Sequence, residues 1–134
     1  MVSPSNLFSL KNKRIIITGS SKGIGKAIAT HCIHSGASVI ISGRNINTCI
    51  KTASKLNIIS QKKFKADKAF PLCFDLSNTS LLSDFITNCV SLLGGVDSLI
   101  CNAVVTQGLL LNSMLNISHE IYTNLLLSNI KNNQ

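Results

Sequence analysis

The stretch Ile15-Ile-Ile-Thr-Gly-Ser-Ser-Lys-Gly-Ile-Gly25 decides the fold of this chain. Three β-branched apolar residues lead into a glycine-rich turn, and residues 26–34 behind the turn carry apolar side chains mostly at helical spacing. The run before the turn is apolar throughout rather than alternating, which suits a parallel strand buried on both faces. The stretch therefore predicts a strand, a glycine turn and a helix.

The three glycines of the turn suit a phosphate-binding site. Gly19 lets the chain leave the strand in a tight turn, and Gly23 has no Cβ to hold a pyrophosphate away from the backbone. Gly25 lets the helix lie close to the sheet. Backbone N–H groups at the helix start then face the anion, with the positive end of the helix dipole behind them. A plain structural turn is the alternative.

The segments after the turn repeat the strand and helix pattern. Gly36 ends the first helix, and a second apolar run follows as a strand. This strand–helix–strand order has the length of a right-handed parallel crossover and argues against a plain turn. We predict an α/β fold, a three-layer Rossmann-type doubly wound parallel sheet of strand order 3-2-1-4, truncated after the fourth strand and helix. The later strands and helices are expected at residues 38–42, 70–74, 79–93, 96–103 and 118–129, with a further helix that Asn45 or Asn47 caps and that runs to about Leu56.

Two motifs resemble those of the short-chain dehydrogenase/reductase family. The first is Thr18-Gly19-x-x-x-Gly23-Ile24-Gly25, and the second is Gly95-Val-Asp97 followed by apolar residues and Asn102-Ala103. The resemblance covers residues 10–131, and in the family Asn102 ties the central strands together. Val104 replaces the glycine that usually follows and brings bulk near the nicotinamide ribose. The string Asn102-Ala-Val-Val105 resembles a variant found in peroxisomal NADPH-dependent carbonyl and retinal reductases.

The end of the second strand bears on the choice of cofactor. An enzyme for the unphosphorylated dinucleotide usually places an acid there for the ribose 2′-hydroxyl, whereas a 2′-phosphate needs a cation. Here the sequence reads Ser42-Gly43-Arg44-Asn45, and Lys22 in the glycine turn is a second cation. The pattern favours NADP(H) over NAD(H). The alternative is that Arg44 merely caps a loop.

Asp75 and Leu76 end the third strand. The resemblance places this pair beside the adenine ring, whereas the residues alone also suit an Asp that begins a helix with Ser77 and Thr79; both can hold. The predicted cofactor-binding residues are Gly19, Ser20, Ser21, Lys22, Gly23, Ile24, Gly25, Arg44, Asn45, Asp75, Leu76, Asn102, Ala103 and Val104.

The resemblance implies an incomplete catalytic set. Asn129 stands seven residues after Tyr122, where the family has the Asn that holds a water in its proton relay; a frayed helix end is the alternative. The family also uses a Tyr, a Lys four residues later and a Ser. Tyr122 is the only tyrosine here, and Leu126 stands at the lysine position.

The resemblance therefore implies the nucleotide-binding half of an NADP(H)-dependent carbonyl reductase or alcohol dehydrogenase, inactive on its own. We expect residues 1–12 to be a leader and residues 13–134 to form a partial NADP(H)-binding Rossmann domain. The complete protein would take a small carbonyl or alcohol substrate and form a homo-oligomer. A catalytically inert nucleotide-binding or regulatory module is the alternative.

The chain is strongly basic, with 13 Lys and Arg against five acids and a net charge of +8. Six lysines lie between positions 51 and 68. A nucleic-acid-binding module is one interpretation, but few aromatic residues are available to stack on bases. A solvated helix face and loop is the better interpretation.

Five cysteines are widely spread and include no Cys-x-x-Cys pair. We expect them to be small buried residues of helices and strands in a reducing compartment, and we predict no metal site. The sequence has no apolar run long enough to span a membrane and no apolar core of a secretory signal. We expect a cytoplasmic protein, with a peroxisome or mitochondrion as alternatives.

Overall fold

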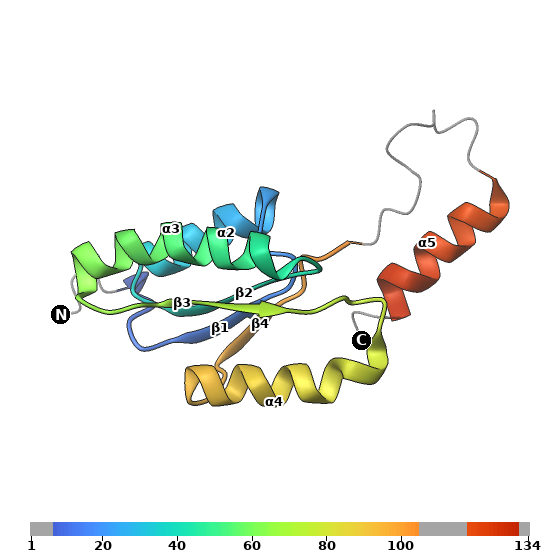
Figure 1. Ribbon diagram of the computed structural model, residues 1–134. Coiled ribbons are helices and arrows are strands. Elements are labelled where there is room, and N and C mark those ends of the chain that lie inside the picture. Colours follow the sequence, from blue (N-terminus) through green and yellow to red (C-terminus); the bar gives the residue numbers. More distant parts are fainter. Residues whose placement is uncertain (1–6, 105–117, 132–134) are drawn as a thin grey trace.

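The computed structural model describes residues 7–104 and 118–131 (Figure 1). Within them, a four-stranded parallel sheet has the order β3-β2-β1-β4. The predicted α/β Rossmann-type sheet and its strand order are confirmed. The strands are β1 (Arg14–Ile17), β2 (Ser38–Gly43), β3 (Ala69–Cys73) and β4 (Ser98–Ile100).

Helices cover both faces of the sheet. One face carries α2 (Gly23–His34) and α3 (Ile46–Phe64), and the other carries α4 (Leu82–Leu93), which follows a short 3₁₀ turn, η1 (Thr79–Leu81) (Figure 1). Helix α5 (His119–Lys131) projects beyond the carboxyl ends of the strands. Among the described helices, none is long and apolar enough to cross a membrane.

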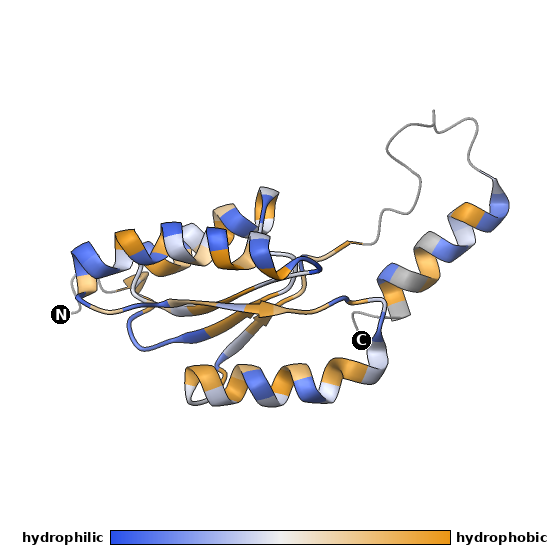
Figure 2. Ribbon diagram, in the orientation of Figure 1, coloured by the Kyte–Doolittle hydropathy of each residue, from blue (hydrophilic) through white to orange (hydrophobic). Residues whose placement is uncertain are grey.

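The central strands bury both of their faces, which explains why their apolar residues do not alternate with polar ones. Ile17 and Ile41 pack toward α2 and α3, whereas Ile16 and Ile40 pack toward α4. The hydrophobic residues of the helices are interspersed with hydrophilic ones (Figure 2), as expected for helices with one face on a sheet and one in water. The rings of Phe74 and Phe85 stack with centroids 4.3 Å apart and join the end of β3 to α4.

Helix α3 is longer than the sequence pattern predicts. It runs through the lysine-rich segment to Phe64 instead of ending near Leu56. Residues 57–64 keep one face on the core, since Ser60 is buried and Ile59 packs against the core cluster, and lysine and glutamine are good helix formers on the exposed face. Lys65 ends the helix in the left-handed conformation at φ +58°. At the other end, the Asn45 side chain accepts a hydrogen bond from the Thr48 N–H at 3.2 Å.

The cysteines divide into two groups. Cys32, Cys49 and Cys89 are buried, as predicted, whereas Cys73 and Cys101 are exposed. The expectation that all five are buried is therefore wrong. The reason is position, because Cys73 ends β3 and Cys101 directly follows β4, the two outer strands of the described sheet.

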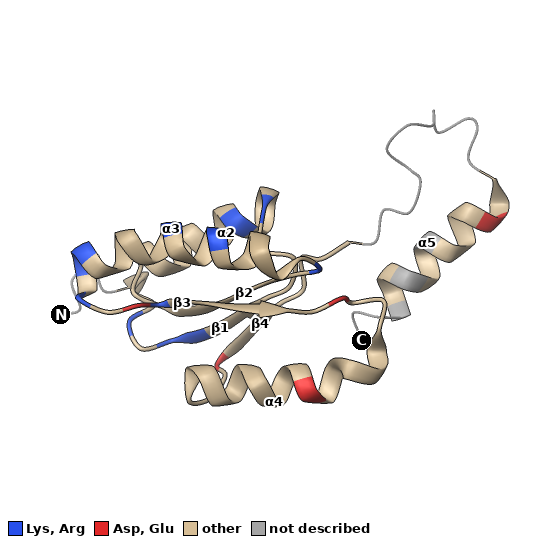
Figure 3. Ribbon diagram, in the orientation of Figure 1, with Lys and Arg blue, Asp and Glu red and all other residues tan. Residues whose placement is uncertain are grey.

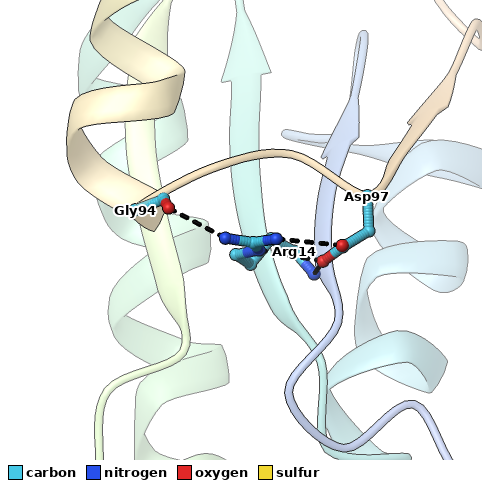
Figure 4. Close-up of polar contacts among 3 residues, drawn as sticks. All are labelled: Arg14, Gly94 and Asp97. Atoms are coloured by element: carbon cyan, nitrogen blue, oxygen red, sulfur yellow. Dashed lines mark hydrogen bonds and ion pairs between the residues drawn. The ribbon is translucent and has the colours of Figure 1, made fainter.

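The start of β1 is tied to the loop before β4 by a charged cluster (Figure 4). Arg14 Nε lies 2.9 Å from Asp97 Oδ2, and Arg14 Nη1 donates to the Gly94 carbonyl at 2.8 Å. The backbone adds two more bonds, since the Arg14 N–H donates to Asp97 Oδ2 and the Asp97 N–H donates to the Arg14 carbonyl, both at 2.8 Å. These contacts hold β4 in its place beside β1.

Candidate nucleotide-binding site

A hollow of about 250 Å³ opens at the carboxyl ends of all four strands. In open α/β sheets, ligands bind at the carboxyl ends of the strands, at the point where the strand order reverses direction. Here that point lies between β1 and β4, because the chain runs from β1 outward to β3 and then returns to the other side of β1. Each strand contributes the residues at its end. The hollow is lined by Thr18, Gly19, Ser21, Lys22, Ser42, Gly43, Arg44, Phe74, Asp75, Leu76, Asn102, Ala103 and Val104.

Two of the turn glycines serve different purposes. A Cβ on Gly25 would clash with the Gly19 carbonyl and lie 2.5 Å from Asn102 Nδ2, so the helix can approach the sheet only without a side chain there. A Cβ on Gly23 would meet nothing within 4 Å, and the backbone has φ +57°. Gly23 is thus required by its left-handed conformation, and the space above it is open to a ligand.

The start of α2 is suited to an anion. Its N-cap residue, Lys22, is extended and makes no side-chain hydrogen bond to the helix, and the first turn holds no acidic residue. The first N–H groups of a helix have no partner within the helix, and the helix dipole is positive there. A phosphate group fits this end of α2.

Hydrogen bonds join the glycine turn to the exit of β4. Thr18 Oγ1 accepts from the backbone N–H groups of Asn102 and Ala103, both at 3.0 Å. In return, Asn102 Nδ2 donates to the carbonyls of Thr18 at 3.0 Å and Gly19 at 3.2 Å. The sequence pattern singles out Asn102 but misses Thr18 as a site residue, although its place directly before Gly19 is a usable signal.

Ser20 lies beneath the turn rather than in the hollow. Its side chain is fully buried, and its hydroxyl donates to the Ile17 carbonyl at 2.7 Å and accepts from the Ser42 N–H at 2.9 Å. Its hydroxyl therefore braces the turn against β1 and β2. Ile24, also in the predicted set, is 76% exposed on the outer side of α2.

Two cations lie at the β2 side of the site. Lys22 and Arg44 line the hollow and also, with Asn45, an adjoining depression. Both cationic residues are exposed. This pairing of positive side chains sits at the point where the ribose of a dinucleotide is expected.

Asp75 does not begin a helix, because η1 starts at Thr79 with Asn78 as its N-cap, and its place beside an adenine stays a prediction. Asp75 lines the hollow, and its Oδ1 accepts from the Ser77 N–H at 3.0 Å and the Ser77 hydroxyl at 2.8 Å. These hydrogen bonds, with a smaller contribution from the Arg44 charge, hold the pKa of the Asp75 carboxyl below its usual value. The group remains an acceptor at neutral pH.

Nine of the fourteen predicted cofactor-binding residues line the hollow, and the other five, Ser20, Gly23, Ile24, Gly25 and Asn45, do not. Asn129 lies on α5, which Figure 1 shows apart from the sheet, and it does not line the hollow; its role in catalysis stays a prediction. Val105, the last residue of the Asn-Ala-Val-Val string, lies outside the described residues. Beside Thr18, the sequence pattern misses three lining residues at strand ends, namely Ser42, Gly43 and Phe74.

Comparison with known proteins agrees with this geometry. The family described as "short chain dehydrogenase" matches residues 13–131. The Hydroxysteroid 11-beta-dehydrogenase 1-like protein of Danio rerio is 33% identical over 96 residues, which are 72% of this chain and 32% of the relative. The chain thus spans about a third of the length of this curated relative.

Solved structures give the same result. A short-chain type dehydrogenase/reductase from Mycobacterium marinum superposes with a TM-score of 0.80 at 27% identity, over 98% of this chain and 49% of that one. A hydroxysteroid dehydrogenase from Escherichia coli gives a TM-score of 0.67 at 32% identity, over 78% of this chain and 40% of that one. The glycine turn, the parallel sheet and these similarities together show that the chain belongs to the short-chain dehydrogenase/reductase family and corresponds to its nucleotide-binding portion.

Proposed function

We propose that this chain binds NADP(H) in preference to NAD(H), as the nucleotide-binding part of an oxidoreductase that interconverts carbonyl compounds and alcohols. The observation that carries the proposal is Arg44. It directly follows β2, at the position where an acid would select the unphosphorylated ribose, and it lines the same hollow as Lys22.

The hollow fits the parts of such a cofactor. The start of α2 above Gly23 would hold the pyrophosphate, and Lys22 and Arg44 would hold the 2′-phosphate. Asp75 and Leu76 would lie at the adenine. When bound, the nicotinamide would supply or accept a hydride at the β4 side of the site, near Asn102 and Val104.

We further propose that the chain by itself binds the nucleotide without turnover. Tyr122 is its only tyrosine and is 56% exposed on α5, and the residue four positions later is Leu126 instead of the expected lysine. The family's reaction uses a tyrosine with a lysine four positions later to protonate the carbonyl, and this sequence holds no such pair. Mixing NADPH with small aldehydes and ketones should therefore leave the nucleotide unoxidised.

Charge reversal at Arg44 tests the cofactor preference. In Arg44→Asp, the affinity for NADPH should fall at least about tenfold, because one charge-assisted contact contributes roughly 1.5 to 3 kcal/mol. The affinity for NADH should stay constant or rise. Fluorescence titration of each nucleotide measures both.

Lys51→Asp is the matched control. Lys51 is exposed on α3 and does not line the hollow, yet the substitution changes the net charge equally. It should leave the preference intact. Equal affinities of the unmodified chain for NADPH and NADH, or an equal loss of both in Arg44→Asp, would contradict the proposal.

A further inference from the structure

Six lysines gather at the edge of the sheet opposite the nucleotide site. Two of them directly precede strands and bond to β2, since the carbonyl of Lys13 accepts from the Ser38 N–H and that of Lys68 from the Val39 N–H. Because α3 runs antiparallel to the strands, its last turn lies at the same edge. We name as the basic face the six residues Lys11, Lys13, Lys62, Lys63, Lys65 and Lys68.

Direct contacts bring members of the basic face together. The ammonium groups of Lys63 and Lys68 each lie 5.3 Å from the ring centroid of Phe64. Lys63 Nζ also donates to the His34 carbonyl at the end of α2, at 2.6 Å. Phe64, Lys63 and Lys11 line one broad hollow of about 490 Å³. Figure 3 shows Lys and Arg at the end of α3 and near the starts of the strands, and others on α2 and at the carboxyl ends of the strands.

The positive charge of this face is not balanced locally. Asp67 is the only acid within the lysine-rich segment, and its carboxylate accepts from the Gln61 amide at 2.9 Å. The nearby Asp97 is engaged by Arg14. The basic face therefore presents a net positive potential to its surroundings.

Two large apolar side chains stand beside these lysines. Leu7 is 68% exposed and Phe8 is 84% exposed, and Phe8 lines the same hollow as Lys11 and Lys63. Exposed apolar groups next to a lysine cluster match the two requirements of a lipid headgroup surface, which takes up apolar side chains and attracts cations.

We propose that the basic face, with Leu7 and Phe8, docks this protein on anionic lipid surfaces. Nucleic acid is the other polyanion that six lysines could attract, but it calls for open aromatic faces on which bases stack. Here two ammonium groups already lie over the Phe64 ring. Docking at this edge leaves the nucleotide site, at the opposite ends of the strands, open to solution.

Vesicle cosedimentation of the full chain tests the proposal. We expect at least about tenfold stronger binding to vesicles with about 30 mol% phosphatidylserine than to phosphatidylcholine alone, with binding lost as salt screens the charges. The double variant Lys62→Glu/Lys65→Glu should lose this binding. The matched double variant Lys51→Glu/Lys55→Glu changes the net charge equally, at exposed positions nearer the start of α3, and should retain most of it.

Phe8→Trp supplies a readout of its own, because the chain has no other tryptophan. Its emission should shift to the blue on anionic vesicles and stay unchanged on neutral ones. Circular dichroism of each variant checks that it is folded. The salt dependence of vesicle binding is measured on the unmodified chain, so it tests the proposal even where a variant fails to fold. Equal binding to both vesicle types, equal loss in the two double variants, or binding to single-stranded RNA with no tryptophan shift on lipid would overturn the proposal.

Discussion

At the scale of single residues, Gly25 is the position where the site tolerates the least change. A Cβ there would clash with the Gly19 carbonyl and crowd the Asn102 amide that joins β4 to the turn. At Gly23 the space is open, and only the left-handed backbone opposes a side chain. The turn therefore needs glycine for two different reasons, close packing at Gly25 and a left-handed backbone at Gly23.

We predict that Gly25→Ala lowers the free energy of unfolding by about 3 kcal/mol, because backbone atoms must shift to make room. Gly23→Ala should cost only about 1 kcal/mol, the strain of a left-handed alanine. Urea unfolding followed by circular dichroism measures both. A loss in Gly25→Ala no larger than that in Gly23→Ala would show that the helix does not approach the sheet as closely as described.

The cysteines give a residue-by-residue test of burial. Burial raises the pKa of the Cys89 thiol to about 11 and also raises the pKa values of Cys32 and Cys49. Since the thiolate is the reactive form, these three should resist iodoacetamide at pH 8 in the folded protein. Exposed Cys73 and Cys101 should be alkylated first, as peptide mass spectrometry can show. Labelling of Cys89 as fast as Cys73 would contradict the described core.

The sequence predicts which residues surround the site better than it predicts where their side chains point. The glycine motif correctly predicts that Gly19 and Lys22 line the hollow, and the end of the second strand does the same for Arg44. Ser20 is in the same motif, yet its hydroxyl turns inward to β1 and β2. Thr18 is missed because its hydroxyl accepts from residues just after β4, more than eighty positions away, and such long-range hydrogen bonds have no local sequence pattern.

At the scale of elements, an ion pair strengthens the joint between β1 and β4 beyond their strand pairing. The hydrogen bonds from the Arg14 side chain and backbone, together with its charge, hold the pKa of the Asp97 carboxyl well below its usual range. A carboxyl whose pKa is lower in the folded state adds stability above its unfolded pKa of about 4, and this stability is lost as the pH falls.

We predict that Asp97→Asn is less stable than the unmodified chain at pH 7, and that the difference shrinks as the pH falls below about 4. The measurement is the midpoint of urea unfolding at a series of pH values. Asp84→Asn, at an exposed position on α4, is the control and should show a much smaller difference at pH 7. A difference between Asp97→Asn and the unmodified chain that is independent of pH would contradict the ion-pair account.

Most elements follow from apolar spacing and glycine stops, and the exceptions have physical causes. The strands β1 and β2 are close to their predicted bounds because burial on both of their faces leaves a strong apolar pattern. The end of α3 carries only a weak apolar pattern, because one of its core-facing positions is the buried polar residue Ser60 beside Ile59, and the helix ends at the left-handed Lys65. The 3₁₀ turn before α4 is likewise not encoded in apolar spacing.

At the scale of the whole molecule, the two ends of the sheet differ in chemistry. The carboxyl end holds the hollow with the glycine turn and Arg44, and the amino end holds the basic face. Along the side, β4 is an outer strand of the described sheet, and Leu99 on it is 52% exposed. Exposed apolar residues also lie on α4.

The central claim is that this chain selects the 2′-phosphorylated nucleotide through its adenosine end. Calorimetric titration with 2′-phospho-ADP-ribose and with ADP-ribose tests it most directly, because both ligands lack the nicotinamide and depend only on the described hollow. We predict saturable binding of both, with the phosphorylated ligand at least about tenfold tighter, equivalent to about 1.4 kcal/mol. Equal affinities, or tighter binding of ADP-ribose by the folded chain, would contradict the account.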